Sequence, residues 1–332
     1  MKYSKMLLIR IKYRLHLLFT RLCFKMGFGR LLLKPRYGER ILVFHGIDIN
    51  GETKYNSRFV SKTYFEELII YLKKNYNIIS LEDFYAKKFK PHTLNIAITF
   101  DDGYLNNYKY AVPILKEHHI PASFYITTVH EKQPYLWMDF IDLVSYHTTK
   151  KEVIFNNKLF KRNTKKEFIH YNIPLKETLK KIPFEKIEAI YSIFKNDWQN
   201  IAKQNLEDYW QLMSYTQIQE ISEDNLFTIG SHAKTHANLT EIPIENAKQE
   251  LLNSKKTLEK ICNTTITTLA FPFGYYNNKL VDIAYNLGYK NILLVDYNNN
   301  SPKIESCKNR FVINPYISLK QQISFLLKGR YY

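Results

Sequence analysis

Two adjacent acidic residues, Asp101 and Asp102, directly follow an apolar run at residues 96–100 and precede Gly103. Because glycine permits a tight turn, this pattern predicts that both carboxylates are presented where a β-strand ends. Two neighbouring acids are costly at such a point unless a positive charge compensates them. A metal ion would do so, leaving one carboxylate as a ligand and the other free to act as a base. An Asp-Asp-Gly turn taken alone is more often structural.

Two histidines, His232 and His236, follow another apolar run at residues 227–230. Imidazoles four residues apart converge on one metal if the segment that carries them coils into a turn. Either histidine alone would more often pack or face solvent, but the pair at the end of a strand favours a site. Two histidines and one carboxylate leave an open metal position for water, and hydrolysis is the natural chemistry of such a site.

Two further stretches end predicted strands. In the first, Phe271, Pro272, Phe273 and Gly274 place two aromatic rings in a proline and glycine turn. This pattern predicts either a groove wall on which a sugar ring stacks or a rigid turn over core aromatics. The second stretch ends with His45 before a glycine, which by itself decides nothing.

Short β-branched runs alternate with helical patterns along most of the chain, which is typical of a βα repeat. The expected strands are 41–44, 96–100, 122–126, 227–230, 268–271, 291–295 and 310–313. Seven strands predict an α/β fold of the incomplete (β/α)7 barrel type. Such barrels carry their active site at the carboxyl ends of the strands, where all four stretches lie.

Helical patterns fill the intervals between these strands. One helix is expected to open with a capping box from Thr63 to Glu66 and to bury Phe65, Leu68, Ile69 and Leu72. Further helices are expected at 108–119, 244–262, 279–287 and 319–327. Residues 129–215 are rich in lysine and lack strand alternation, so we interpret them as a mostly helical insertion after the third strand.

The charge of the chain is concentrated at its amino end. The net charge is +17, and ten of the excess positive charges lie before residue 37 because the first acid is Glu39. We therefore divide the chain into a basic segment, 1–36, and one domain, 37–332, whose mild charge requires no special partner. Three scattered cysteines indicate neither a disulfide framework nor a cysteine-based zinc site.

The basic segment has the pattern of an amphipathic helix. Leu8, Ile11, Leu15, Leu18 and Leu22 recur at steps of three and four residues, with basic residues between them. The helix would lie on an anionic membrane surface or dock on the domain, and no nucleic-acid motif accompanies its charge. Its charges are too frequent for a membrane span, and it lacks a secretory signal pattern. A cytoplasmic location at the inner face of the membrane is therefore expected.

The motifs together resemble those of the polysaccharide deacetylase family, also called the NodB homology domain or carbohydrate esterase family 4. The sequence Thr99-Phe-Asp-Asp-Gly103 followed by Ser231-His-x3-His236 carries the resemblance. The stretches ending at His45 and Gly274 are similar to the branch of poly-N-acetylglucosamine deacetylases. Residues 40 to about 318 are covered.

The resemblance implies roles by matching position. Asp101 would be the general base, while one divalent metal ion, with zinc the usual choice, would bind Asp102, His232 and His236. The peptide N–H of Phe273 would donate to the oxyanion. Cobalt, nickel and iron also suit such a site.

Two departures from the family pattern stand out. The common pattern has an arginine where this chain has Ala270, and a late Leu-x-His motif supplies the general acid, but no histidine follows His236. In the branch with permuted motif order a histidine near the amino end of the domain serves as the acid. His45 matches that position, so we assign the acid role to it.

The resemblance implies a metal-dependent hydrolase that removes N-acetyl groups from amino sugars of a surface polysaccharide or its lipid-linked precursor. The N-acetylated glycan would be its partner. One alternative is a non-catalytic sugar-binding protein on a deacetylase scaffold, suggested by the two departures. Another is an amide hydrolase of the same barrel type that acts on a small cyclic or nucleobase-derived amide.

Overall fold

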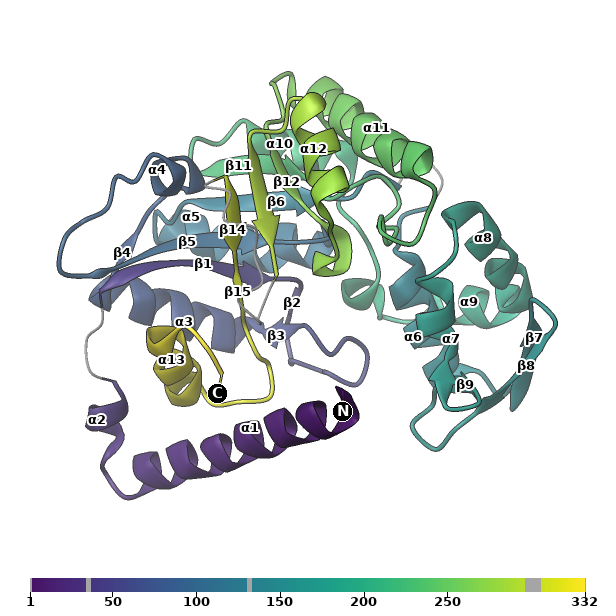
Figure 1. Ribbon diagram of the computed structural model, residues 1–332, viewed down its shortest axis with the longest axis horizontal. Coiled ribbons are helices and arrows are strands. Elements are labelled where there is room, and N and C mark those ends of the chain that lie inside the picture. Colours follow the sequence, from purple (N-terminus) through teal and green to yellow (C-terminus); the bar gives the residue numbers. More distant parts are fainter. Residues whose placement is uncertain (1, 34–36, 130–132, 296–305, 332) are drawn as a thin grey trace.

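The computed structural model describes residues 2–33, 37–129, 133–295 and 306–331. Its centre is a parallel sheet that curves into a barrel, with strand order β14-β13-β12-β11-β6-β5-β1-β15 and β4 beside β5 (Figure 1). The strands are β1 (Gly38–Phe44), β4 (Asn77–Ile78), β5 (Leu94–Phe100), β6 (Ala122–Ile126), β11 (Phe227–Ser231), β12 (Thr268–Ala270), β13 (Asn291–Leu294), β14 (Cys307–Asn309) and β15 (Phe311–Val312).

The two edges of this sheet meet at consecutive residues. β14 pairs with β13, whereas β15 pairs with β1, and only Arg310 separates β14 from β15. Residues 307–312 therefore pair with both edges of the sheet and, as the seventh strand, nearly close the barrel. The expected (β/α)7-type fold is confirmed, and all seven expected strands are present with ends shifted by at most a few residues.

Apolar side chains fill both faces of the strands, as expected for parallel strands covered by helices. All seven residues of β5 are buried. A small inner cluster includes Ile41, Ala97, Tyr125, Ala270 and Leu293, one from each of five strands. The larger cluster lies between the sheet and the surrounding helices. The rigid barrel therefore fixes the ends of its strands.

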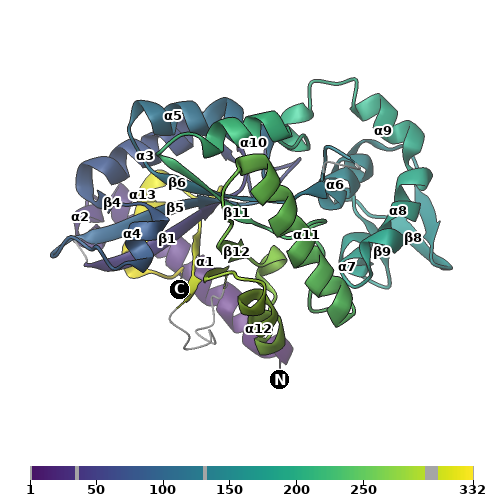
Figure 2. The same ribbon diagram turned by 90° about the horizontal axis from the view of Figure 1, so that it is seen from above.

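Helices surround the sheet, as the view from above shows (Figure 2). The expected helices are confirmed at 244–262, 279–287 and 319–327, while 108–119 consists of a π-helical turn followed by a short α-helix. The elements are α3 (Lys62–Asn75), α4 (Leu81–Tyr85), η1 (Asn107–Ala111), α5 (Val112–Glu117), α10 (Tyr215–Ser222), α11 (Ile244–Cys262), η4 (Pro272–Gly274), α12 (Asn278–Asn286) and α13 (Leu319–Lys328).

The start of α3 differs from the expected capping box. The N-cap is Ser61, whose side chain accepts a hydrogen bond from the backbone N–H of Tyr64, so Thr63 lies inside the first turn. The prediction was wrong by two residues because Ser61 already has the extended backbone that an N-cap requires. The buried face was predicted correctly and consists of Phe65, Leu68, Ile69 and Leu72.

The stretch after the third barrel strand forms a lobe with its own core, beside the barrel in Figure 1. It contains the expected helices and also a four-stranded antiparallel sheet, which the sequence analysis did not anticipate. Its elements are α6 (Trp137–His147), β7 (Glu152–Phe155), β8 (Lys158–Arg162), β9 (Phe168–His170), β10 (Ile173–Pro174), α7 (Leu175–Leu179), α8 (Phe184–Ile193), α9 (Lys195–Ile201) and η3 (Glu207–Tyr209).

The basic amino-terminal segment forms α1 (Lys2–Lys25) and α2 (Gly29–Leu32). α1 runs beneath the barrel alongside α13 (Figure 1), so the segment docks on the domain. No helix in the described part of the chain has an apolar stretch long enough to cross a membrane.

Candidate metal centre and catalytic site

The two carboxylates lie in a tight turn at the carboxyl end of β5. Asp102 and Gly103 have φ values of 75° and 85°, a left-handed conformation that glycine adopts freely and aspartate more readily than most residues. The peptide N–H of Asp101 donates to the carbonyl of Phe44, which ties the turn to the end of β1 at 3.0 Å. Both carboxylates are buried, with exposed fractions of 3% and 0%.

The loop that carries the two histidines follows β11 and is held from outside by one residue of α11. The Glu250 carboxylate accepts hydrogen bonds from the peptide N–H groups of Lys234 and Thr235, at 3.0 and 2.7 Å. Ala233 and His236 have positive φ values of 61° and 55°. The coil that these residues form is the turn that the spacing of the histidines required.

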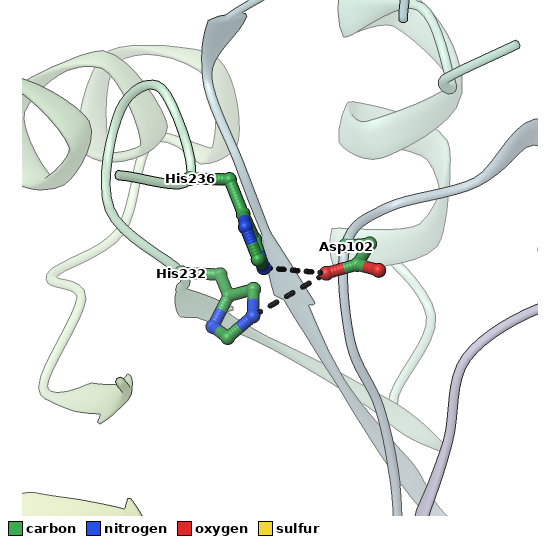
Figure 3. Close-up of side chains that lie close together, drawn as sticks. All are labelled: Asp102, His232 and His236. Carbon is green, nitrogen blue, oxygen red and sulfur yellow. Dashed lines mark ion pairs between the residues drawn. The ribbon is translucent and has the colours of Figure 1, made fainter. Parts of the chain in front are cut away.

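The two imidazoles converge on Asp102 (Figure 3). The Asp102 Oδ1 atom is 3.1 Å from His236 Nε2 and 3.4 Å from His232 Nε2. Both rings are buried, with 2% of each histidine exposed. The structure thus brings together the three residues that the resemblance names as metal ligands.

The distances and the hydrogen bonding of these atoms fit a divalent metal ion. Two ligand atoms each about 2.1 Å from a tetrahedral zinc ion lie roughly 3.4 Å apart, close to the separations found here. Among the described residues, Asp102 Oδ1 has no hydrogen-bond partner although it is fully buried. A buried carboxylate oxygen that faces two ring nitrogens needs a cation, which is either a metal ion or a proton on one imidazole.

The tautomer of His232 supports the same assignment. Its Nδ1–H donates to the carbonyl of Ala270 at 2.7 Å, so the lone pair of Nε2 points toward Asp102. His236 Nδ1 is buried and has no partner among the described residues. The donor set can therefore hold a metal ion, with one imidazole oriented by the barrel itself.

The other oxygen of Asp102 is held by Arg58, from the loop between β2 (Ile47–Asp48) and β3 (Val60–Ser61). Arg58 Nη1 lies 2.9 Å from Asp102 Oδ2. Burial would raise the pKa of Asp102, but the guanidinium of Arg58 and the two histidines outweigh it and hold that pKa well below 3.8. Asp102 is therefore ionised and ready to bind a cation.

Arg58 also connects the site to the insertion. Its Nη2 donates to the hydroxyl of Tyr104 at 2.9 Å and approaches Asp139 of α6 at 3.5 Å. Asp139 is buried and accepts from Tyr104 at 2.7 Å and from Asn56 at 3.0 Å. Burial raises its pKa to about 7, although Arg58 opposes the shift. Sequence analysis found none of this network, because Arg58 and Asn56 lie in a loop without a motif.

Asp101 faces a different cation. The guanidinium of Arg310 binds both of its oxygens, with Nη1–Oδ1 and Nη2–Oδ2 distances of 2.6 and 2.7 Å, and also donates to Thr99 Oγ1 at 3.3 Å. Burial would raise the pKa of Asp101, but Arg310 outweighs it and the pKa lies below 3.8. Asp101 is thus an ionised carboxylate that is not needed as a ligand.

Arg310 was present in the expected strand 310–313, but the sequence analysis gave it no role. It is 3% exposed and lies where β14 passes into β15, so barrel closure directs its side chain to Asp101. A charged residue that opens a buried strand was the available signal. Arg310 supplies the guanidinium that the family pattern places at position 270, where Ala270 instead accepts a hydrogen bond from His232.

His45 directly follows β1 and is half-buried. Burial first, and then the cation of Arg58, lowers its pKa to about 3, while Asp102 and Asp101 act in the opposite direction. Its imidazole is therefore neutral in the unliganded protein. The structure brings His45 into the electrostatic field of both carboxylates.

The aromatic turn after β12 divides into a buried and an accessible half. Phe271 is 1% exposed and packs on Tyr276, and Pro272 is also buried, so neither offers a face to a ligand. Phe273 is half-buried, with its ring 4.5 Å from that of His236 and its φ at 59°. Of the four residues expected to form a groove wall, only Phe273 and Gly274 are accessible, and their contact with a sugar stays a prediction.

Comparison with protein families gives one match. The polysaccharide deacetylase family matches residues 89–144 and 185–292, a region that contains both carboxylates, both histidines and the aromatic turn. The residues between the two matched parts, 145–184, include the antiparallel sheet of the insertion. A comparison with curated proteins finds no match.

Solved structures share the fold. A Streptococcus pyogenes deacetylase, PplD, in complex with acetate, is 18% identical with a TM-score of 0.53, covering 86% of this chain and 96% of its own. IcaB from Ammonifex degensii is 15% identical with a TM-score of 0.53, covering 88% and 98%. A polysaccharide deacetylase from Bacillus cereus is 19% identical with a TM-score of 0.53, covering 87% and 69%.

Proposed function

Because the chain belongs to the polysaccharide deacetylase family, a family of N-deacetylases, we propose the following reaction and substrate for it. The protein hydrolyses N-acetyl groups of amino sugars in a surface polysaccharide or its lipid-linked precursor. The reaction depends on one divalent metal ion, with zinc the first choice. The observation that carries this proposal is the convergence of His232 and His236 on Oδ1 of Asp102, beside a second carboxylate, Asp101, that Arg310 holds separately.

Asp102, His232 and His236 would hold the metal ion. When bound, the ion would polarise the acetyl carbonyl and increase the acidity of the attacking water. Asp101 would accept the proton of that water, and Arg310 would keep both carboxylate oxygens in place. Water adds to the acetyl carbon, the C–N bond breaks, and acetate and a free amine leave.

His45 is the proposed donor of the proton to the leaving nitrogen. Because its pKa is lowered to about 3, it holds no extra proton before the reaction at neutral pH. The proton that Asp101 takes from water would therefore move through His45 to the nitrogen as the C–N bond breaks. The peptide N–H of Phe273 would donate to the developing oxyanion.

The neighbouring units of the glycan would bind toward the insertion. A cavity of about 310 Å³ lies between the loop of Tyr55 and Ser57 and insertion residues that include Tyr146 and Lys176. Ser57 lines this cavity and directly precedes Arg58, which binds Asp102, so one loop contributes a residue to the cavity and a residue to the site. Its tyrosine and lysine side chains suit a polar sugar.

A non-catalytic sugar-binding protein is the competing function. Two departures from the family pattern favoured this alternative. The first, the missing arginine at position 270, no longer favours it, because Arg310 binds the proposed base Asp101. The second departure is the missing late histidine. An active enzyme then requires that His45 deliver the proton to the leaving nitrogen.

Acetate release separates the two functions. We expect the metal-loaded protein to release acetate from an N-acetylated glucosamine oligomer, and Asp101→Asn to lower kcat by roughly 10²- to 10⁴-fold. Asp282→Asn, an exposed carboxylate on α12 that does not line the cavity beside the insertion, is the matched control and should leave the rate unchanged. Saccharide binding without acetate release, equal in wild type and Asp101→Asn, would support the binding protein instead.

A further inference from the structure

α1 leaves a continuous apolar stripe uncovered. Its members share one helical face because they recur at steps of three and four residues. Their exposed fractions run from 46% to 63% although all are large apolar side chains. The stripe consists of five residues of α1, Ile11, Leu15, Leu18, Phe19 and Leu22, and of Met26 directly after the helix.

The opposite face of α1 is the one that docks on the domain. Gln321 of α13 donates to the Leu17 carbonyl at 3.0 Å and to Thr20 Oγ1 at 3.1 Å. Asn314 donates to the Tyr13 hydroxyl at 2.7 Å. Because these contacts fix the rotation of the helix, the stripe faces away from α13.

Basic residues flank the stripe. α1 contains seven lysine or arginine residues and no acid. Of these, Lys12, Arg14, Arg21 and Lys25 are exposed. Two such faces would repel each other, so a second copy of this chain is a poor partner, whereas an anionic lipid surface complements both the charge and the apolar side chains.

We propose that α1, while docked on α13, lies in the surface of an anionic phospholipid bilayer with its stripe among the acyl chains. α1 would thus both dock on the domain and bind the membrane, the two roles that the sequence analysis left as alternatives. A bilayer against the stripe would lie on the side of α1 that faces away from the barrel.

Vesicle flotation of the full-length protein tests the proposal. The probes are vesicles of phosphatidylcholine alone and of phosphatidylcholine mixed with phosphatidylglycerol. We expect flotation with the anionic vesicles only, weakened by added salt. Replacing Leu15, Leu18 and Leu22 together by glutamate should reduce binding by about tenfold or more.

Ile154→Glu is the control because Ile154, 66% exposed, is the one exposed apolar residue of β7, a strand that lies far from α1 in Figure 1. It should bind vesicles as the wild type does. Absence of wild-type flotation, or equal flotation of the triple variant, would overturn the proposal. So would a wild-type dimer that the triple variant converts to a monomer, because a second copy would then cover the stripe. The readout needs no substrate, so it is independent of the proposed reaction.

Discussion

Asp101 and Asp102 are consecutive residues of one turn, equally buried, yet their surroundings differ. Both oxygens of Asp101 bind Arg310 at the barrel seam, whereas Asp102 gives one oxygen to Arg58 and turns the other toward two imidazoles. Arg310 keeps Asp101 ionised and holds both of its oxygens, whereas Oδ1 of Asp102 remains directed at the two imidazoles. The comparison indicates that residues from distant parts of the chain, Arg310 and the two histidines, determine which carboxylate acts as the base and which as the metal ligand.

Replacing Arg310 should have the largest effect on the different roles of Asp101 and Asp102. In Arg310→Met the burial of Asp101 is no longer opposed, so its pKa should rise and the acid limb of the pH profile of kcat/KM should move to higher pH. We expect kcat at neutral pH to fall roughly 10- to 100-fold.

Arg310→Lys should restore part of the rate, because a cation returns without the bidentate geometry. Lys308→Met, on β14 and half-buried, is the control and should change neither the rate nor the profile. If Arg310→Met lowers the rate but leaves the acid limb in place, Arg310 has only a structural role.

The pH dependence of metal binding should show a smaller effect on the Asp102 side. In the metal-free protein burial would lower the pKa of His232, but Asp101 and Asp102 outweigh it and raise that pKa above 6.5. The pKa of His236 is lowered, chiefly by burial, and Asp102 stays ionised. One proton, on His232, should therefore compete with the metal as the pH falls through the raised pKa.

Titration of the metal-free protein with zinc at several pH values measures this competition. Just below the raised pKa, affinity should fall by up to about tenfold per pH unit, the slope of one proton. A slope of two protons would mean that both histidines are protonated before binding.

The sequence was sufficient for the parts that follow local patterns. Apolar runs identified the seven barrel strands, and the spacing of His232 and His236 predicted a coil that the structure contains. The antiparallel sheet of the insertion was missed, although β7 alternates between exposed and buried residues, because its strands are only two to five residues long.

The cations of the site could not be placed from sequence. Arg310 is 209 positions from Asp101, and only barrel closure brings them together. Arg58 lies in a loop whose path depends on its contacts with Tyr104 and Asp139. Charged residues that come from far along the chain leave no local pattern in the sequence. The Asp-Asp-Gly turn and the histidine pair can be recognised because each lies within a few consecutive residues.

Metal content tests the central claim most directly, because it needs no substrate. Wild type, Asp101→Asn and Asp102→Asn should be purified together, loaded with zinc and measured by elemental analysis. We predict about one metal per chain in the wild type and in Asp101→Asn, and loss of the metal in Asp102→Asn. Equal metal content in both variants, or no metal in the wild type, would contradict the division of the two carboxylates into a base and a ligand.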